Sequence, residues 1–232
     1  MVCLIDYDNL LSPHQRLGLR LLVERIAERV SQTGTAVGPR AHVRLYGGWY
    51  EGNSLSRKAQ SLAAELRRDF PTVFRLTAGN VPVSAELALS LDIDPSTHLY
   101  HTLRWQPPPD VRCKDPRSAG CTDPSCPLFV VHDFLSRRRC PKSGCTIEPR
   151  GLLYRVGQKL VDSMLIADIF SVLRRTSEPI VVVSSDDDLW PGIQSIVSLG
   201  VQAVHVHTKN GAIARNPYSR PGATGYIAIE LV

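Results

Sequence analysis

The chain has 232 residues, of which 43% are hydrophobic and 21% charged, and its formal net charge is +5. This length suits one large domain or one domain with a sizeable insertion, and the composition excludes disordered and fibrous classes. No apolar run reaches the ~18 residues that span a bilayer, and no signal peptide precedes the first apolar segment. We therefore expect a soluble, cytoplasmic protein with no membrane partner.

Hydrophobic periodicity predicts strands and helices that alternate along the first hundred residues. In chain order they are a strand over 2–6, a helix over 12–31, a strand over 41–46, a helix over 54–69, and strands over 72–76, 83–93 and 98–105, the last two joined by a turn at 94–97. This alternation predicts an α/β fold with a mainly parallel sheet and helices on both faces.

The alternation stops between residues 107 and 150, which are rich in proline, arginine and cysteine and contain one strand-like segment at 128–132. It then resumes with a helix over 158–175, a strand over 180–184, a helix over 190–199, a strand over 201–207 and an edge strand over 226–232. We expect one domain, formed by residues 1–106 and 151–232, that carries residues 107–150 as an insertion.

Positive charge is concentrated in this insertion. Of the 27 basic residues only five are lysine, and residues 112–150 hold eight basic against four acidic residues. Arginine suits bidentate phosphate contacts, so a local basic patch favours a nucleic-acid partner over a solvated face without function. The predicted RNA-binding residues are Arg112, Lys114, Arg117, Arg137, Arg138, Arg139 and Lys142.

Five of the six cysteines lie between Cys113 and Cys145, and four of them form two short-spaced pairs in turn-rich segments. Two turns that each present two thiolates suit tetrahedral Zn²⁺, whereas the reducing compartment and the odd count disfavour disulfides. We expect structural zinc ligands at Cys121, Cys126, Cys140 and Cys145, with Cys113 as a substitute and His132 as a weaker competitor. Cys3 is expected to be a core residue.

Acidic residues follow the predicted strands at their carboxyl ends, where open α/β sheets place their ligands. Asp6 ends the first strand, Asp162 lies early in the helix over 158–175, and Asp186, Asp187 and Asp188 follow a buried strand. Carboxylates gathered at one edge repel each other unless cations bind, which predicts a Mg²⁺ or Mn²⁺ site. Taken singly, each aspartate is also a typical helix N-cap.

These acids and their neighbours resemble the motifs of the NYN family, a branch of the PIN-like and FLAP-like nuclease superfamily. The similar segments are Leu4-Ile5-Asp6-Tyr7-Asp8-Asn9-Leu10, Lys159-Leu160-Val161-Asp162 with Asp168, and Val183-Ser184-Ser185-Asp186-Asp187-Asp188-Leu189-Trp190-Pro191. The resemblance spans residues 1–100 and 151–207. Leu160 and Ser185 stand where the family has glycines, and Leu189 stands where it has an aromatic residue.

The resemblance implies a Rossmann-like PIN/NYN three-layer sandwich and an endoribonuclease that uses Mg²⁺ or Mn²⁺ and water to cut single-stranded RNA or structured loops. It implies catalytic roles for Asp6, Asn9, Asp162, Asp186 and Asp188, with the four aspartates as metal ligands. Asp168 and Ser184 are expected to lie behind these ligands and to orient them.

Two other functions are compatible with the sequence. One is a catalytically silent RNA-binding module of the same fold. The other is a HAD-like phosphatase in which Asp6 is the nucleophile and Asp8 the general acid. Asn9-Leu10 departs from that family's pattern, and Asp162 would have no role in it. The glycine-rich motifs of nucleotide-cofactor sites are absent from the sequence, so no nucleotide cofactor is expected.

Overall fold

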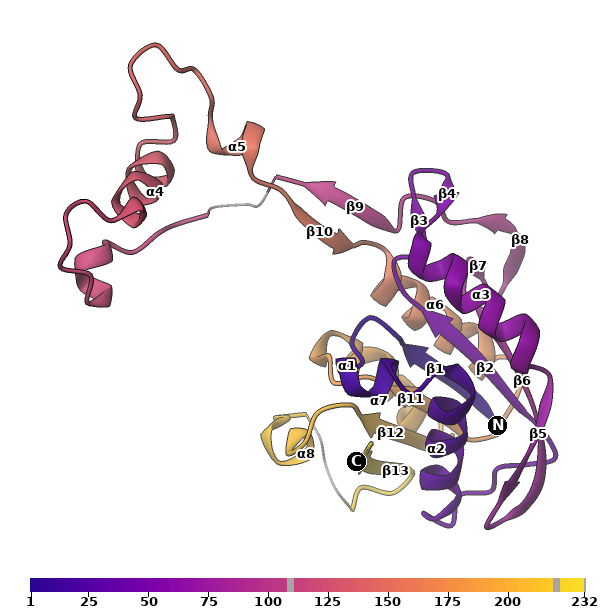
Figure 1. Ribbon diagram of the computed structural model, residues 1–232. Helices are drawn as coiled ribbons and strands as arrows, with labels where there is room; N and C mark the ends of the chain where they lie inside the picture. Colours follow the sequence, from indigo (N-terminus) through magenta and orange to yellow (C-terminus); the bar gives the residue numbers. More distant parts are fainter. Residues whose placement is uncertain (108–110, 219–221, 232) are drawn as a thin grey trace. The chain divides into compact units, whose positions relative to one another are not determined.

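The computed structural model describes residues 1–107, 111–218 and 222–231. Backbone contacts divide the chain into two compact units, a larger unit of residues 1–103 and 158–232 and a small unit of residues 104–157 (Figure 1). No helix in the described ranges is long and apolar enough to cross a membrane.

Within the described residues of the larger unit, seven strands form one sheet in the order β13-β12-β11-β1-β2-β6-β5. They are β1 (Val2–Asp6), β2 (Ala41–Tyr46), β5 (Thr72–Leu76), β6 (Gly79–Leu87), β11 (Ile180–Val183), β12 (Ala203–His207) and β13 (Tyr226–Glu230). Neighbouring strands are parallel except for β5, which pairs antiparallel with β6. The predicted α/β class with a mainly parallel sheet is confirmed, and β13 is an edge strand as expected.

Helices pack on both faces of this sheet (Figure 1). The first core lies beneath α2 (Leu19–Ser31) and α3 (Arg57–Asp69), and the second lies beneath α6 (Val161–Leu173) and α7 (Trp190–Ser198). In β1, Cys3 and Ile5 enter the first core and Leu4 enters the second, because successive side chains alternate across a strand. Strands covered on both faces are apolar throughout, which explains the continuous apolar runs of β1 and β11.

The single helix predicted over 12–31 is wrong, because the chain forms two helices, α1 (Ser12–Gln15) and α2. Gly18 separates them with a φ of +77°, a left-handed conformation that glycine adopts at little cost. The backbone N–H of Leu19, the first residue of α2, donates to Glu65 Oε2 at 2.8 Å. A distant acid on α3 thus fixes this boundary.

Three other local predictions are also wrong. The turn predicted at 94–97 is the strand β8 (Asp94–His98), which pairs with β7 (Ser90–Leu91). The segment predicted as a strand at 128–132 lies within α4 (Pro127–Ser136), where proline near the first helical position favours a helix start. The helix expected over 54–69 begins at residue 57, because the preceding serine caps it and a short hairpin of β3 (Tyr50–Glu51) and β4 (Ser54–Leu55) precedes that cap.

The small unit contains short elements and little buried apolar surface. They are β9 (Leu103–Gln106), η1 (Pro116–Ala119), α4, α5 (Pro149–Leu152) and β10 (Arg155–Gln158), the two strands lying at its ends. Pro116 is the only buried residue in its described ranges, while Leu128 and Val130 of α4 are 54% and 59% exposed. So small a core gives little stability by itself.

Candidate functional site

The carboxyl ends of β1 and β11 meet because the strands are parallel neighbours, with Ile5 opposite Val183. Asp6 is the last residue of β1 and is 1% exposed. Its Oδ2 accepts the hydroxyl of Ser184, the residue after β11, at 2.9 Å. Its Oδ1 accepts the backbone N–H of Asn9 at 3.3 Å. The structure therefore brings Asp6, Asn9 and Ser184 together at this edge of the sheet.

Asp186 and Asp188 lie in the turn that follows Ser184. The backbone N–H of Asp186 donates to Ser184 Oγ at 3.0 Å, and Asp186 Oδ1 accepts the backbone N–H of Asp188 at 3.0 Å. This second bond caps the short helix η2 (Asp187–Leu189). Asp186 therefore acts as a helix cap with one of its two carboxylate oxygens.

Asp162 lies in the first turn of α6. Leu160, the N-cap residue of this helix, has a φ of +69°, in the left-handed region that favours glycine. Leu160 is one of the two residues that stand where the NYN motif has glycine. Asp162 Oδ1 is buried and has no hydrogen-bond partner among the described residues.

The aspartates influence each other's ionisation. Burial, together with the smaller effects of the Asp162 and Asp8 charges, raises the pKa of Asp6 to about 7, against the hydrogen bonds from Ser184 and Asn9. Burial also raises the pKa of Asp162, and the second and third causes are the charges of Asp186 and Asp188. The four predicted metal-binding aspartates, Asp6, Asp162, Asp186 and Asp188, therefore form one electrostatically coupled group.

This group is not a preformed metal cage. Among the described residues, no set of three or more His, Cys, Asp or Glu side chains is placed to hold a metal ion. Two observations nevertheless fit a cation: Asn9 Oδ1 and Asp162 Oδ1 are buried oxygens without a donor. A buried acceptor without a partner is costly, and oxygen atoms are the ligands that Mg²⁺ prefers. The residues present therefore suit a hard divalent cation.

Asp8 has contacts that hold two loops together. Its Oδ2 accepts the backbone N–H of Gly48 at 2.7 Å, and its Oδ1 pairs with Lys58 of α3. The Lys58 ammonium also lies 4.9 Å from the centre of the Tyr7 ring. Asp8 is therefore anchored to a cation, while Asp6 is buried with both oxygens hydrogen-bonded. This environment suits a ligand carboxylate better than an exposed nucleophile.

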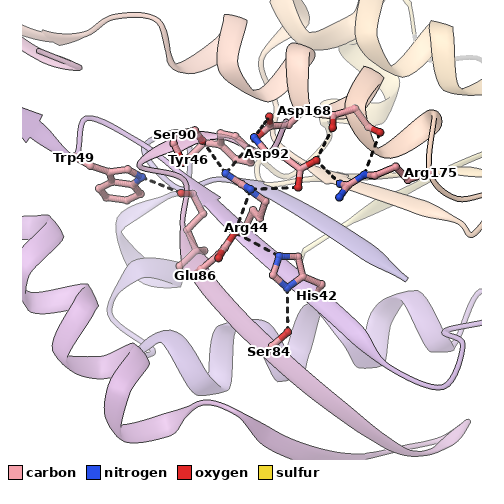
Figure 2. Close-up of polar contacts among 12 residues, drawn as sticks. His42, Arg44, Tyr46, Trp49, Ser84, Glu86, Ser90, Asp92, Asp168 and Arg175 are labelled. Atoms are coloured by element: carbon pink, nitrogen blue, oxygen red, sulfur yellow. Dashed lines mark hydrogen bonds and ion pairs between the residues drawn. The ribbon is translucent and has the colours of Figure 1, made fainter. Parts of the chain in front are cut away.

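Asp168 is fully buried in a separate polar network (Figure 2). Its Oδ2 accepts the Tyr46 hydroxyl at 2.6 Å and lies 3.5 Å from Arg44 Nη2. Its Oδ1 accepts the backbone N–H of Asp92 at 2.7 Å. Burial raises the pKa of Asp168, whereas the hydrogen bonds from the Tyr46 hydroxyl and the Asp92 backbone N–H and the charge of Arg44 act in the opposite direction. These contacts join Asp168 to β2 and to the turn between β7 and β8, rather than to Asp6.

Two histidines at the same sheet edge were not singled out by sequence reasoning. The rings of His205 and His207 on β12 are 3.9 Å apart. His205 Nε2 lies 3.0 Å from the carbonyl oxygen of Ser184, and burial is the main cause that lowers its pKa to about 3. His207 is 1% exposed, and neither ring nitrogen has a partner among the described residues. Their i, i+2 spacing at the end of a buried strand was the available signal.

The cysteines of the small unit are partly exposed free thiols. The thiols of Cys121 and Cys126 are in hydrogen-bond contact, which raises the pKa of Cys121. Cys140 and Cys145 belong to a second turn, in which the backbone N–H of Cys145 donates to Lys142 at 3.2 Å. The chemistry and the turns fit thiolate ligands, although the described residues do not bring three of them together. His132 contacts Ser136 at 3.3 Å.

The seven predicted RNA-binding residues of the small unit are all exposed: Arg112, Lys114, Arg117, Arg137, Arg138, Arg139 and Lys142. Arg117 lies over the ring of Phe129, 5.4 Å from its centre. Arg137 pairs with Asp133 at 3.1 Å, one turn earlier on α4. Arg112 and Arg138 both line one cavity, and Cys113 lies on the same wall. The structure thus places these charges on the surface, where a polyanion can reach them.

Comparisons of the chain with protein-family models, with curated proteins and with solved structures found no significant match. The likeness to the NYN family therefore rests on the motifs quoted above.

Proposed function

We propose that this protein is a metal-dependent endoribonuclease with a PIN/NYN-type three-layer sandwich, and that it hydrolyses phosphodiester bonds in single-stranded RNA or in structured loops. The fold supports this proposal because the acids lie at the carboxyl edge of a parallel sheet. Asp6 and Asp186 follow two neighbouring strands, and Asp162 is electrostatically coupled to both.

One observation carries the proposal: Asn9 Oδ1 and Asp162 Oδ1, which belong to or adjoin this group of aspartates, are buried acceptors without a donor among the described residues. Buried acceptors find N–H or O–H partners in most proteins, so an unpartnered amide oxygen and an unpartnered carboxyl oxygen in this group favour a bound cation. Mg²⁺ or Mn²⁺ held by Asp6, Asp162, Asp186 and Asp188 would lower the pKa of water and neutralise charge on a phosphodiester.

The surrounding residues orient this group. Ser184 donates to Asp6 and accepts from the backbone of Asp186, so it links the acids of two strands. Asp8, held by Lys58, fixes the loop that carries Asn9. The exposed arginines and lysines of the small unit are proposed to hold the RNA backbone, and zinc on its cysteine pairs is proposed to stabilise them.

The test is cleavage of labelled single-stranded RNA and of total tRNA with Mn²⁺, with Mg²⁺ and with EDTA. The wild type is expected to cut in either metal and to stop in EDTA, and Asp186→Asn is expected to lose at least about a hundredfold in rate, as is typical for loss of electrostatic stabilisation. Asp187→Asn is the matched control, because Asp187 is adjacent but has no place in the NYN pattern.

Three outcomes contradict the proposal in different ways. RNA binding by both proteins without cleavage favours the catalytically silent module. Release of phosphate from phosphomonoesters without RNA cleavage favours the phosphatase. Equal cleavage rates of Asp186→Asn and the wild type would show that this group of aspartates has no role in the reaction.

A further inference from the structure

A cavity of about 600 Å³ lies wholly within the small unit, between the chain around α4 and the segment that contains α5. Its lining includes three arginines, one glutamate and several apolar residues. The residues that matter here are Arg112, Arg138, Arg150, Glu148, Leu135 and Leu153. Three positive charges against one negative charge favour an anion.

The guanidinium groups around the cavity have no partners among the residues that the structure describes. Arg137, which immediately precedes Arg138, pairs with Asp133 at 3.1 Å. In contrast, the side chains of Arg112, Arg138 and Arg150 make no ion pair or hydrogen bond with any residue in the part of the chain that the structure describes. An arginine fork carries five N–H donors that match phosphate oxygens, so three unpaired forks around one hollow form a receptive site.

Arg138 also has an unusual backbone conformation. It follows the C-cap of α4 and has a φ of +56°, in the left-handed region where helices commonly end on glycine. A side chain other than glycine at this position carries strain, and such strain is typical of residues retained for a ligand. Because Arg138 lines the cavity, the guanidinium offers a reason for this residue at a strained position.

We propose that this cavity binds one unpaired nucleotide of the RNA strand, with its phosphate on Arg112, Arg138 and Arg150 and its base and sugar against Leu135 and Leu153. The proposal rests on the proposed function, because it names the part of the RNA that the small unit recognises. The cavity volume lies within the ~300–1,000 Å³ that small-ligand sites occupy. The mixed lining suits a molecule with one anionic end and one flat, weakly polar end.

Equilibrium dialysis of the full-length protein against adenosine 5′-monophosphate, adenosine and inorganic phosphate tests this site. Adenosine 5′-monophosphate is expected to bind at least about tenfold more tightly than either fragment, because only it engages both parts of the lining. Arg138→Gln and Arg150→Gln are each expected to weaken this binding by roughly tenfold, as for the loss of one charged hydrogen bond. Arg155→Gln, in the same unit but outside the cavity lining, is the matched control.

Arg138→Gly separates binding from folding. It removes the guanidinium and supplies the residue that a φ of +56° favours, so the melting temperature is expected to equal or exceed that of the wild type while binding falls. For RNA that is bound but not cut, the slope of log affinity against log salt is expected to fall by about one in Arg138→Gln.

Several results overturn the proposal. Adenosine 5′-monophosphate binding that is absent, equal among the variants, or no tighter than phosphate binding excludes a nucleotide site in this cavity. Binding to phosphatidylserine vesicles in place of the nucleotide assigns the arginines to a lipid surface and also excludes it. None of these measurements involves cleavage, so arginine-dependent nucleotide binding without RNA cleavage contradicts only the nuclease.

Discussion

Ser184 donates its hydroxyl to Asp6 Oδ2 at 2.9 Å, and the same Ser184 oxygen accepts the backbone N–H of Asp186 at 3.0 Å. One fully buried serine thus joins the acid at the end of β1 to the acidic turn after β11. The arrangement depends on the parallel pairing of β1 with β11. The position of Asp186 therefore depends on Ser184, an uncharged residue.

Ser184→Ala is expected to destabilise the fold by about 1–3 kcal/mol, because it leaves a buried carboxylate and a backbone N–H with fewer partners. Cleavage is expected to fall more than stability alone explains, since Asp186 loses its link to Asp6. Urea unfolding and cleavage rates of folded protein measure the two effects. Full cleavage at an unchanged unfolding free energy would show that Ser184 has no orienting role.

Asp168→Ala is expected to destabilise the protein by about 3–5 kcal/mol, the usual cost of removing one partner from a buried ionic network. Arg44 and Tyr46 would then be left beside an empty, dry position (Figure 2). Metal binding by the fraction that remains folded is expected to match the wild type. Retained stability together with lost metal binding would instead place Asp168 behind the metal ligands, as the NYN resemblance implies.

Asp6 gives the metal-free protein a distinctive pH dependence. Its pKa rises from the ordinary 3.8 to about 7, so between these values the folded state binds more protons and stability falls as pH rises. In Asp6→Asn the carboxyl group that binds this proton is replaced by an amide that does not titrate. The unfolding free energy of this variant relative to the wild type is expected to grow between pH 4 and 7, by at most about 1.4 kcal/mol per pH unit. Mg²⁺ is expected to remove this pH-dependent difference between the unfolding free energies of the variant and the wild type. A difference in unfolding free energy that stays constant with pH in EDTA would refute the raised pKa of Asp6.

His205 has the opposite effect on the pH dependence of stability: it makes the fold less stable as pH falls. Burial and the neighbouring His207 lower its pKa from 6.5 to about 3, so the unfolded chain takes up a proton that the folded chain does not. Below pH 6.5 this difference destabilises the fold increasingly until about pH 3. His205→Gln is expected to be relatively more stable in acid than at pH 7, by urea unfolding. A wild type and variant that lose stability in parallel would show that His205 does not titrate in this way.

Zinc binding by the small unit can be measured through the reactivity of its cysteine thiols. Cys3 is buried and its pKa is raised to about 12, so it is expected to stay unreactive towards a thiol reagent at pH 8 until the protein unfolds. The five partly exposed cysteines are expected to react in chelator, and four of them to be protected by one equivalent of zinc. The same number of reactive thiols with zinc and with chelator would contradict a zinc site on these cysteines.

Asp8→Asn distinguishes the nuclease from the phosphatase. Asp8 pairs with Lys58, whose side chain is 41% exposed, and such exposed pairs contribute at most about 1 kcal/mol. RNA cleavage is therefore expected to change by less than about tenfold. Phosphatase chemistry with Asp8 as general acid would collapse in this variant. Loss of all activity in folded Asp8→Asn would favour that second mechanism.

Sequence patterns predicted those parts of the larger unit that depend on local periodicity. The alternation of strands and helices predicted the mainly parallel sheet, and therefore the edge at which Asp6 and Asp186 both lie. Long-range contacts were not predictable from sequence patterns. The Glu65 carboxylate accepts the backbone N–H of the first residue of α2, and the backbone N–H of Asp92 donates to Asp168 in a buried network. In the small unit, apolar character at Leu128 indicated a strand, although a preceding proline and no partner strand favoured the helix.

The measurement that tests the central claim most directly is Mn²⁺ binding by the full-length protein, followed by electron paramagnetic resonance of the free ion. Wild type and Asp187→Asn are expected to bind Mn²⁺ equally, and Asp162→Asn is expected to lose at least about tenfold in affinity, because it removes one charged ligand. Equal Mn²⁺ affinity in Asp162→Asn and the wild type, or no Mn²⁺ binding by either, would contradict a metal site at this sheet edge.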